Sequence, residues 1–193
     1  MRCDSQKLLH ELKAILIKIL TEAKAMQDEP LALLKQKPAI NAWNALECIE
    51  HLNRYAAFYL PAIKNALTNG KNATPSSEFK SGWLGNWFAN MMKVGGKGYK
   101  RMKSPADKNP MDTKLTKDVL QTFLVQTEEL TSLLDDASGI NLTTVKTPVS
   151  ISSFIKLRLG DTLRFVIYHM ERHMIQAQQA LNAAAEKSVK KMD

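Results

Sequence analysis

The sequence reads Leu159-Gly-Asp-Thr-Leu-Arg-Phe-Val-Ile-Tyr-His169-Met-Glu-Arg-His173-Met-Ile-Gln176 in its C-terminal third, and this stretch decides the fold. Its apolar residues recur at three- and four-residue spacing, which predicts an amphipathic helix over Ser152–Glu186 with a break near Gly160. His169 and His173 are four residues apart, so both rings lie on one helix face and can bind one metal ion. Because this spacing also occurs on solvated helices, the pair alone leaves a structural role open.

Three further segments carry the same helical spacing of apolar residues, over Asp4–Met26, Ala42–Leu67 and Thr113–Ala137. Asn41 is the expected N-cap of the second segment, and Asp112 or Thr113 that of the third. Four amphipathic helices and no alternating strand pattern predict an all-α fold, a four-helix bundle. We expect one domain over residues 1–193, which is an ordinary length for a single core.

The connections between these helices read as loops. Residues 71–112 contain five glycines and three prolines and are expected to form an irregular insertion. One short apolar helix within it, around Trp83–Met92, is expected to pack on the bundle as a side helix or lid. Leu31–Leu34 is expected to form one short turn, and residues 140–150 read as a connector too short to build a sheet. The charged tail, residues 187–193, is expected to fray.

Composition excludes several classes of protein. The longest apolar runs are only a few residues, so no membrane span or secretory signal is expected. Cys3 and Cys48 form no C-x-x-C pair, and two isolated cysteines without a signal peptide fit a cytoplasmic protein. A homodimer is compatible with the spare apolar side chains of Met91 and Met92.

The net charge of +8 raises the question of a nucleic-acid partner. Six of the basic residues lie in the loop 93–108, where Tyr99 is the only aromatic residue. No helix-turn-helix signature accompanies them, so we expect no nucleic-acid binding. The loop is either a solvated segment or a rim that binds an anionic small molecule.

A third histidine, His51, lies on the second predicted helix, on or beside the face that should point into the bundle. Metal sites in helix bundles are built in this way, from side chains on facing helices. A histidine on an apolar face is also often a hydrogen-bonded core residue. Spacing alone therefore does not decide between a ligand and a core residue.

Two motifs together resemble the DinB-like (DinB/YfiT-type) metal-binding family. One is Trp43-Asn-Ala-Leu-Glu-Cys-Ile-Glu-His51-Leu, and the other is the last helix quoted above, with its H-x-x-R-H-x-x-Q pattern. The resemblance implies an up-up-down-down four-helix bundle with a three-histidine site open to solvent or substrate. It implies that His51, His169 and His173 hold one divalent metal ion.

Some members of that superfamily are thiol transferases or isomerases that use low-molecular-weight thiols. The resemblance therefore implies a metal-dependent enzyme of thiol S-transferase or hydrolase type, with zinc or nickel as the metal, a thiol as a second cofactor, and a small-molecule substrate. The alternative is a non-catalytic metal-binding or protein-interaction bundle. A metal pocket sealed by Trp83, Trp87 and Phe88 would favour the alternative, and an open position beside a basic cleft would favour the enzyme.

Three neighbours of the histidines are candidates for supporting roles. Glu47, one turn before His51, is a candidate general base or an acceptor for an imidazole N–H, and otherwise a solvated glutamate. Gln176, one turn beyond His173, is a candidate to orient a ligand, and otherwise a polar core residue. Tyr55 is a candidate hydroxyl near the metal, and otherwise a core aromatic.

Overall fold

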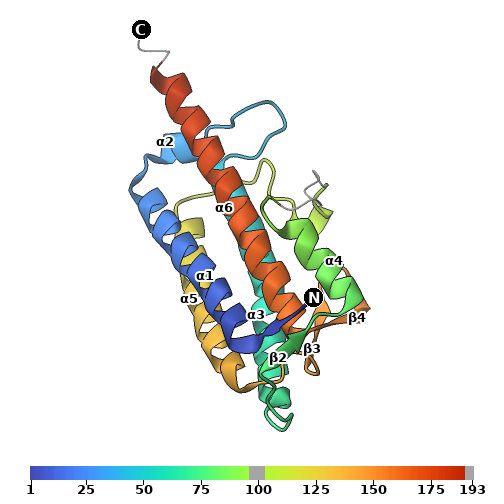
Figure 1. Ribbon diagram of the computed structural model, residues 1–193. Coiled ribbons are helices and arrows are strands. Elements are labelled where there is room, and N and C mark those ends of the chain that lie inside the picture. The colour runs from blue at the N-terminus through green and yellow to red at the C-terminus, as the bar shows by residue number, and fades with distance from the viewer. Residues whose placement is uncertain (96–102, 190–193) are drawn as a thin grey trace.

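Four long helices lie side by side in the computed structural model, which describes residues 1–95 and 103–189 (Figure 1). Helices α1 and α3 each pack on both α5 and α6. The all-α prediction is confirmed, since each of the four predicted helices has a counterpart. The four are α1 (Ser5–Asp28), α3 (Ala45–Gly70), α5 (Asp118–Asp136) and α6 (Leu159–Val189).

The helices run up, down, down and up in chain order (Figure 1). The backbone N–H of Ser5, at the start of α1, donates to the carbonyl of Ser77 just beyond the end of α3, at 2.7 Å. At the opposite end, the Lys117 ammonium beside the start of α5 donates to the carbonyl of Gln27 at 2.6 Å. The expected up-up-down-down order is therefore not confirmed. The long connection after α3 returns along the bundle, so α5 starts at the far end and runs parallel to α3.

Two short antiparallel strand pairs correct the prediction that the chain forms no sheet. Strand β1 (Arg2–Asp4) pairs with β2 (Glu78–Lys80), and β3 (Lys146–Val149) pairs with β4 (Ser152–Arg158). Segment 152–158, assigned to the last helix from its sequence, is thus a strand, and α6 begins at Leu159. Strands β1, β2 and β3 have only three or four residues, and the seven residues of β4 do not alternate apolar with polar. Cross-strand pairing stabilises them.

Two helix starts also differ from the expected ones. Helix α3 is capped by Asn44, whose side chain accepts from the N–H of Glu47 in a capping box. Asn41 instead lies in the preceding loop with a φ of 58°. Helix α5 starts at Asp118, five residues later than expected, and Lys117 occupies the N-cap position; Asp112, with a φ of 61°, lies in the preceding turn.

The shorter elements agree with the sequence in part. Both predicted short helices are present, α2 (Leu31–Leu34) and α4 (Trp83–Met92), and α4 packs on α6 as the side helix expected. The connection 71–112 is more regular than predicted, since it also holds β2 and the 3-10 turn η1 (Ala106–Lys108). A second such turn, η2 (Ala137–Gly139), ends α5. Helix α6 continues through the first residues of the expected tail, and residues 190–193 lie outside the described part.

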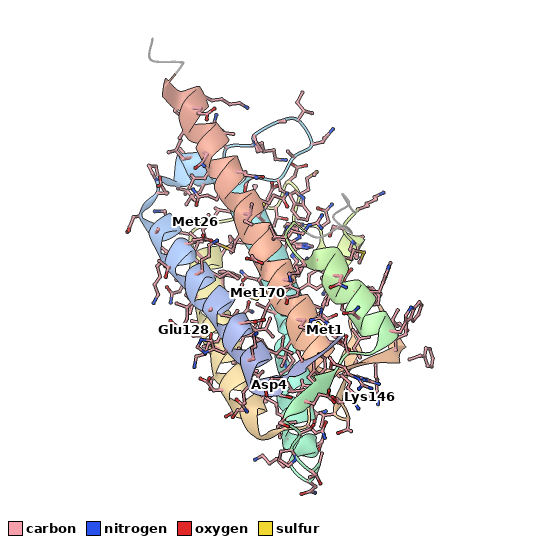
Figure 2. All side chains as sticks on the ribbon, viewed as in Figure 1. Met1, Asp4, Met26, Glu128, Lys146 and Met170 are labelled. Atoms are coloured by element: carbon pink, nitrogen blue, oxygen red, sulfur yellow. The ribbon has the colours of Figure 1, made fainter. Side chains whose placement is uncertain are left out.

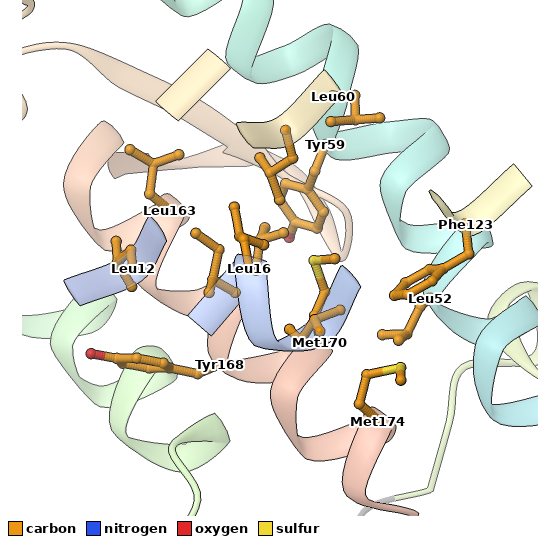
Figure 3. Close-up of a cluster of buried hydrophobic side chains, with 14 of the residues drawn as sticks. Leu12, Leu16, Leu52, Tyr59, Leu60, Phe123, Leu163, Tyr168, Met170 and Met174 are labelled. Carbon is orange, nitrogen blue, oxygen red and sulfur yellow. The ribbon is translucent and has the colours of Figure 1, made fainter. Parts of the chain in front are cut away.

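The core lies between the four long helices. Figure 3 shows leucines of α1 and α3 meeting Phe123 of α5 and methionines of α6. Figure 2 shows Met26 and Met170 between the helices, whereas Glu128 and Lys146 lie on the outside. Among the described residues, no helix combines the length and apolar character needed to cross a bilayer.

A buried ion pair fastens α4 to α6. The Arg164 side chain, 2% exposed, lies 3.2 Å from the Asp161 carboxylate and donates to the side-chain oxygens of Asn86 and Asn90 on α4 at 3.2 and 3.3 Å. Asp161 in turn accepts from the backbone N–H of Gly82, at the start of α4, at 2.7 Å. Because a buried charge needs polar partners, this network fixes where α4 sits on the bundle.

We expect Asp161→Asn to lower the free energy of unfolding by about 3 kcal/mol, because the substitution leaves the Arg164 charge buried without its counterion. The matched control is Asp135→Asn, which removes an exposed ion pair with Lys13 and should cost less than about 1 kcal/mol. Urea unfolding followed by circular dichroism measures both. Equal losses in the two variants would show that the buried pair does not anchor α4.

Candidate metal centre

Three histidines from two helices converge on one point. His51 comes from α3, and His169 and His173 come from α6. Their candidate ligand nitrogens all lie within 4.8 Å of one another. The ring centre of His173 is 4.5 Å from that of His51 and 4.6 Å from that of His169. The predicted meeting of these three residues is therefore confirmed.

The spacing of the nitrogens fits a shared ion. The Nε2 atoms of His51 and His169 are 3.2 Å apart. Two nitrogens that bind one ion at about 2.0–2.1 Å are roughly 2.9–3.4 Å apart, depending on octahedral or tetrahedral geometry. The same distance also suits an N–H···N hydrogen bond between the rings, which an ion would replace. His51 and His169 thus already stand at a spacing that one divalent ion can bridge, with His173 within 4.8 Å.

Hydrogen bonds on the far side of two rings leave their Nε2 atoms available to a metal. The Nδ1 of His51 lies 2.7 Å from the carbonyl oxygen of Lys108, and the Nδ1 of His173 lies 2.9 Å from Oε1 of Gln176. Since both partners are acceptors, each Nδ1 carries the proton and each neutral ring has its lone pair on Nε2. Such partners hold a metal-binding imidazole in one tautomer and orientation.

Burial keeps all three rings neutral. Loss of solvent lowers the pKa of His51 to about 4, and the positive charges of Arg54 and Lys108 act in the same direction. Burial, followed by the proximity of His51, lowers the pKa of His173 to about 3. The pKa of His169 falls well below 6.5, first because of burial and then because of the other two histidines. Neutral imidazole is the form that binds metals, so protons compete weakly for this site near neutral pH.

Aromatic rings enclose the histidines. The Trp43 ring lies 4.8 Å from His51 and 5.8 Å from His173, and the Tyr55 ring lies 4.9 Å from His51 and 4.7 Å from His169. Burial raises the pKa of Tyr55 to about 12, so its hydroxyl keeps its proton near neutral pH. The core-aromatic interpretation of Tyr55 agrees with these contacts, and a hydroxyl role at the metal stays a prediction.

Two partners of the histidines were not predicted from the sequence. Phe165 stacks parallel to His169, with the ring centres 5.9 Å apart. It lies one turn before His169 on α6, so helical spacing would have found it. The Lys108 carbonyl that orients His51 is a backbone atom 57 residues away, and no side-chain pattern signals such a contact.

Glu47 is bonded at the start of α3. Its carboxylate is 1% exposed, so the solvated-glutamate interpretation is wrong. Oε2 accepts from the N–H of Asn44 at 2.9 Å, and Oε1 accepts from the N–H of Asp112 at 2.7 Å. Both oxygens thus tie loop backbone to α3. Its role as a general base stays a prediction, and these contacts supply a structural reason for a glutamate at this position.

An open cleft of about 710 Å³ leads to the histidines. Its described lining includes the cations Lys103 and Arg172 and no aspartate or glutamate. Trp83 and Trp87, which could have sealed the site, are not among the residues that line the cleft. Their side chains are 85% and 54% exposed. Residues 96–102 of the basic loop 93–108, which is either a solvated segment or an anion-binding rim, lie outside the described residues.

Comparison with protein families returns one match that bears on this site. A family model described as the DinB superfamily matches residues 18–177, a range that contains all three histidines. Comparison with curated proteins gives no match. Comparison with solved structures gives none either.

The free energy of unfolding of chelator-treated protein should fall as the pH falls from 6.5 towards 4. In that range the unfolded chain binds protons at His51 that the folded chain does not, because the pKa of His51 is about 4 in the folded chain against 6.5 unfolded. His51 alone should account for about 3 kcal/mol. Urea unfolding at several pH values measures the slope.

The control for this measurement is His51→Gln, which removes the titrating ring and should show a shallower pH dependence over the same range. Other groups titrate below pH 5, so the difference between the two slopes is the informative quantity. Identical slopes in the two proteins would contradict the assignment of a depressed pKa to His51.

Proposed function

The chain belongs to the DinB superfamily, and from this premise we propose that it binds one divalent metal ion through His51, His169 and His173 and uses it in catalysis on a small molecule. The observation that carries the proposal is the convergence of three neutral histidines at the end of an open cleft. A core histidine cluster with only a structural role would need no such access. Zinc and nickel are the proposed metals, since neutral imidazole suits both.

Of the two reaction classes, thiol S-transfer is supported better than hydrolysis. A metal bound at three histidines lowers the pKa of a thiol or a water molecule that joins it. Metal-dependent hydrolases commonly add a carboxylate as general base, as in the H-E-x-x-H proteases. The described cleft lining contains no carboxylate, and both oxygens of Glu47 are bonded to backbone N–H groups. A thiol already deprotonated at the metal site needs no such base.

The proposed transfer joins a low-molecular-weight thiol to an electrophilic carbon. The sulfur forms the new C–S bond, the leaving group departs with the bonding electrons, and the thiol proton passes to solvent. Lys103 and Arg172 place positive charge on the cleft wall, which favours a thiol that carries carboxylates. Trp43 and Tyr55 pack against the histidines at this end of the cleft.

The second candidate function is a non-catalytic metal-binding bundle, for which the missing carboxylate in the described cleft lining is the supporting observation. Both candidates share the metal site and differ in what the cleft does. Metal content tests the shared premise, and turnover separates the two.

His173→Ala should lower the affinity for zinc or nickel at least about 100-fold, because it removes one of the three proposed ligands. Gln176→Leu should lower it by about 10- to 100-fold, since the His173 ring then loses the partner that orients it. Metal analysis of purified proteins and competition with a chromogenic chelator measure both effects.

His10→Ala is the matched control, because His10 is an exposed histidine on α1, away from the proposed ligand set. It should retain the metal content of the wild-type protein. Equal metal content in wild type and His173→Ala would rule out the three-histidine site.

Metal-loaded protein should conjugate glutathione or cysteine to a chromogenic aryl halide at least about tenfold faster than chelator-treated protein, because only the loaded site lowers the thiol pKa. Adding metal back should restore the rate. Lys103→Ala should raise KM for glutathione more than it lowers kcat, since the proposed role of Lys103 is attraction of the thiol's carboxylates. A metal-loaded protein with no conjugating activity towards either thiol would favour the non-catalytic bundle.

A further inference from the structure

An apolar groove adjoins the histidine cleft. It holds a volume of about 130 Å³ and lies between α3, α4, α6 and the β3–β4 hairpin. Four residues line both the cleft and the groove, so the two spaces lie side by side: Tyr55, Met92, Lys103 and Pro105. Two rings that line the groove, Tyr55 and Phe165, also contact His169, so the groove lies next to the histidines.

The described lining of the groove is mostly carbon. Phe88 and Met91 come from α4, Leu157 from β4, and Phe165 from α6. The hydroxyl of Tyr59 is satisfied within the wall, since it accepts from the N–H of Ser150 at 3.3 Å and lies 3.4 Å from the Ser150 hydroxyl. The groove thus offers little to a polar group and favours an apolar one.

The volume sets the size of the occupant. A dry cavity of about 150 Å³ in a protein core binds benzene, so about 130 Å³ suits one ring or a short alkyl chain. The groove is also preformed, because the Asp161–Arg164 network fixes α4 and antiparallel pairing fixes the hairpin. Preformed apolar sites bind without the cost of ordering their walls.

We propose that this groove binds the apolar part of an amphipathic small molecule whose polar end reaches His51, His169 and His173. The polar end is an anionic or metal-binding group, because the histidines line the cleft and Lys103 lies where the cleft adjoins the groove. The apolar end is one ring or a chain of about four to six carbons, as the groove volume dictates. This inference rests on the proposed function and names the substrate class for the same site.

Straight-chain alkyl hydroxamates test the proposal, since the hydroxamate binds metal and the chain length can be varied from two to eight carbons. Calorimetry on zinc-loaded protein should show affinity rising roughly threefold to fourfold per methylene, the gain expected from burial of each CH₂. The rise should stop near six carbons, where the groove is full. Chelator-treated protein should keep the chain-length dependence and lose the contribution of the hydroxamate.

Ile151→Gln is the main test variant, because Ile151 lines the groove and is 60% exposed, so its replacement should not disturb folding. Ile17→Gln is the matched control, with the same substitution at a 55% exposed isoleucine on α1. Ile151→Gln and Met91→Gln should flatten the chain-length dependence and leave acetohydroxamate affinity unchanged. Ile17→Gln should match wild type in both respects.

The outcomes separate the groove from the metal site. Metal-dependent binding with no chain-length dependence would overturn the groove proposal and leave the metal site standing. Chain-length dependence without any effect of metal would support the groove and overturn the proposed function. A wild-type dimer that Ile151→Gln dissociates, with no chain-length dependence, would assign the groove to a second copy of the chain and overturn the proposal. Sedimentation of wild type, Ile151→Gln and Ile17→Gln detects that case.

Discussion

The packing of α3 against α6 is the contact on which the rest of this structure depends. It brings one histidine of α3 against two histidines of α6, and no other pair of elements contributes to the three-histidine cluster found among the described residues. The two helices run in opposite directions, so His51 meets residues more than a hundred positions away in sequence. The apolar stripes of both helices drive this packing, and the histidines share the faces that it buries.

Burial gives the histidines their chemistry and imposes a cost. Removing imidazole from water disfavours its charged form, which keeps the rings neutral and lowers their pKa values. His51 and His169 are buried and His173 is half-buried, and a nitrogen–nitrogen contact of 3.2 Å joins His51 to His169. A divalent ion at their centre would satisfy the Nε2 lone pairs together. The neutral state of the rings and their convergence therefore both favour a divalent ion at this point.

Polar groups elsewhere in the fold set the shape of the space around the histidines. The carboxylate of Glu47 holds the start of α3 and the chain near Asp112, and the Asp161–Arg164 pair holds α4. Each of these two groups holds a segment that lines the cleft. The Asp161–Arg164 pair holds α4, and Glu47 holds the segment before α5. The shape of the candidate substrate space thus depends on buried charges that do not take part in the proposed chemistry.

The sequence by itself determined the local features. The period of apolar residues gave the four long helices and α4, and four-residue spacing placed His169 and His173 on one face. The joint motif on two helices then identified His51 as their partner. These properties follow from residues that are close in sequence, and a helix is built from local hydrogen bonds.

Only the tertiary structure decided what depends on distant contacts. The sequence of β4 favours a helix, and its pairing with β3 makes it a strand. The sequence alone leaves Glu47 as a solvated or catalytic candidate, because its partner, the N–H of Asp112, is 65 residues away. Three further features depend on contacts between distant segments: the helix order, the Lys108 carbonyl behind His51 and the groove beside the cleft. Each of these features joins segments that are far apart in the chain. The sequence pattern of one segment does not determine which other segment packs on it.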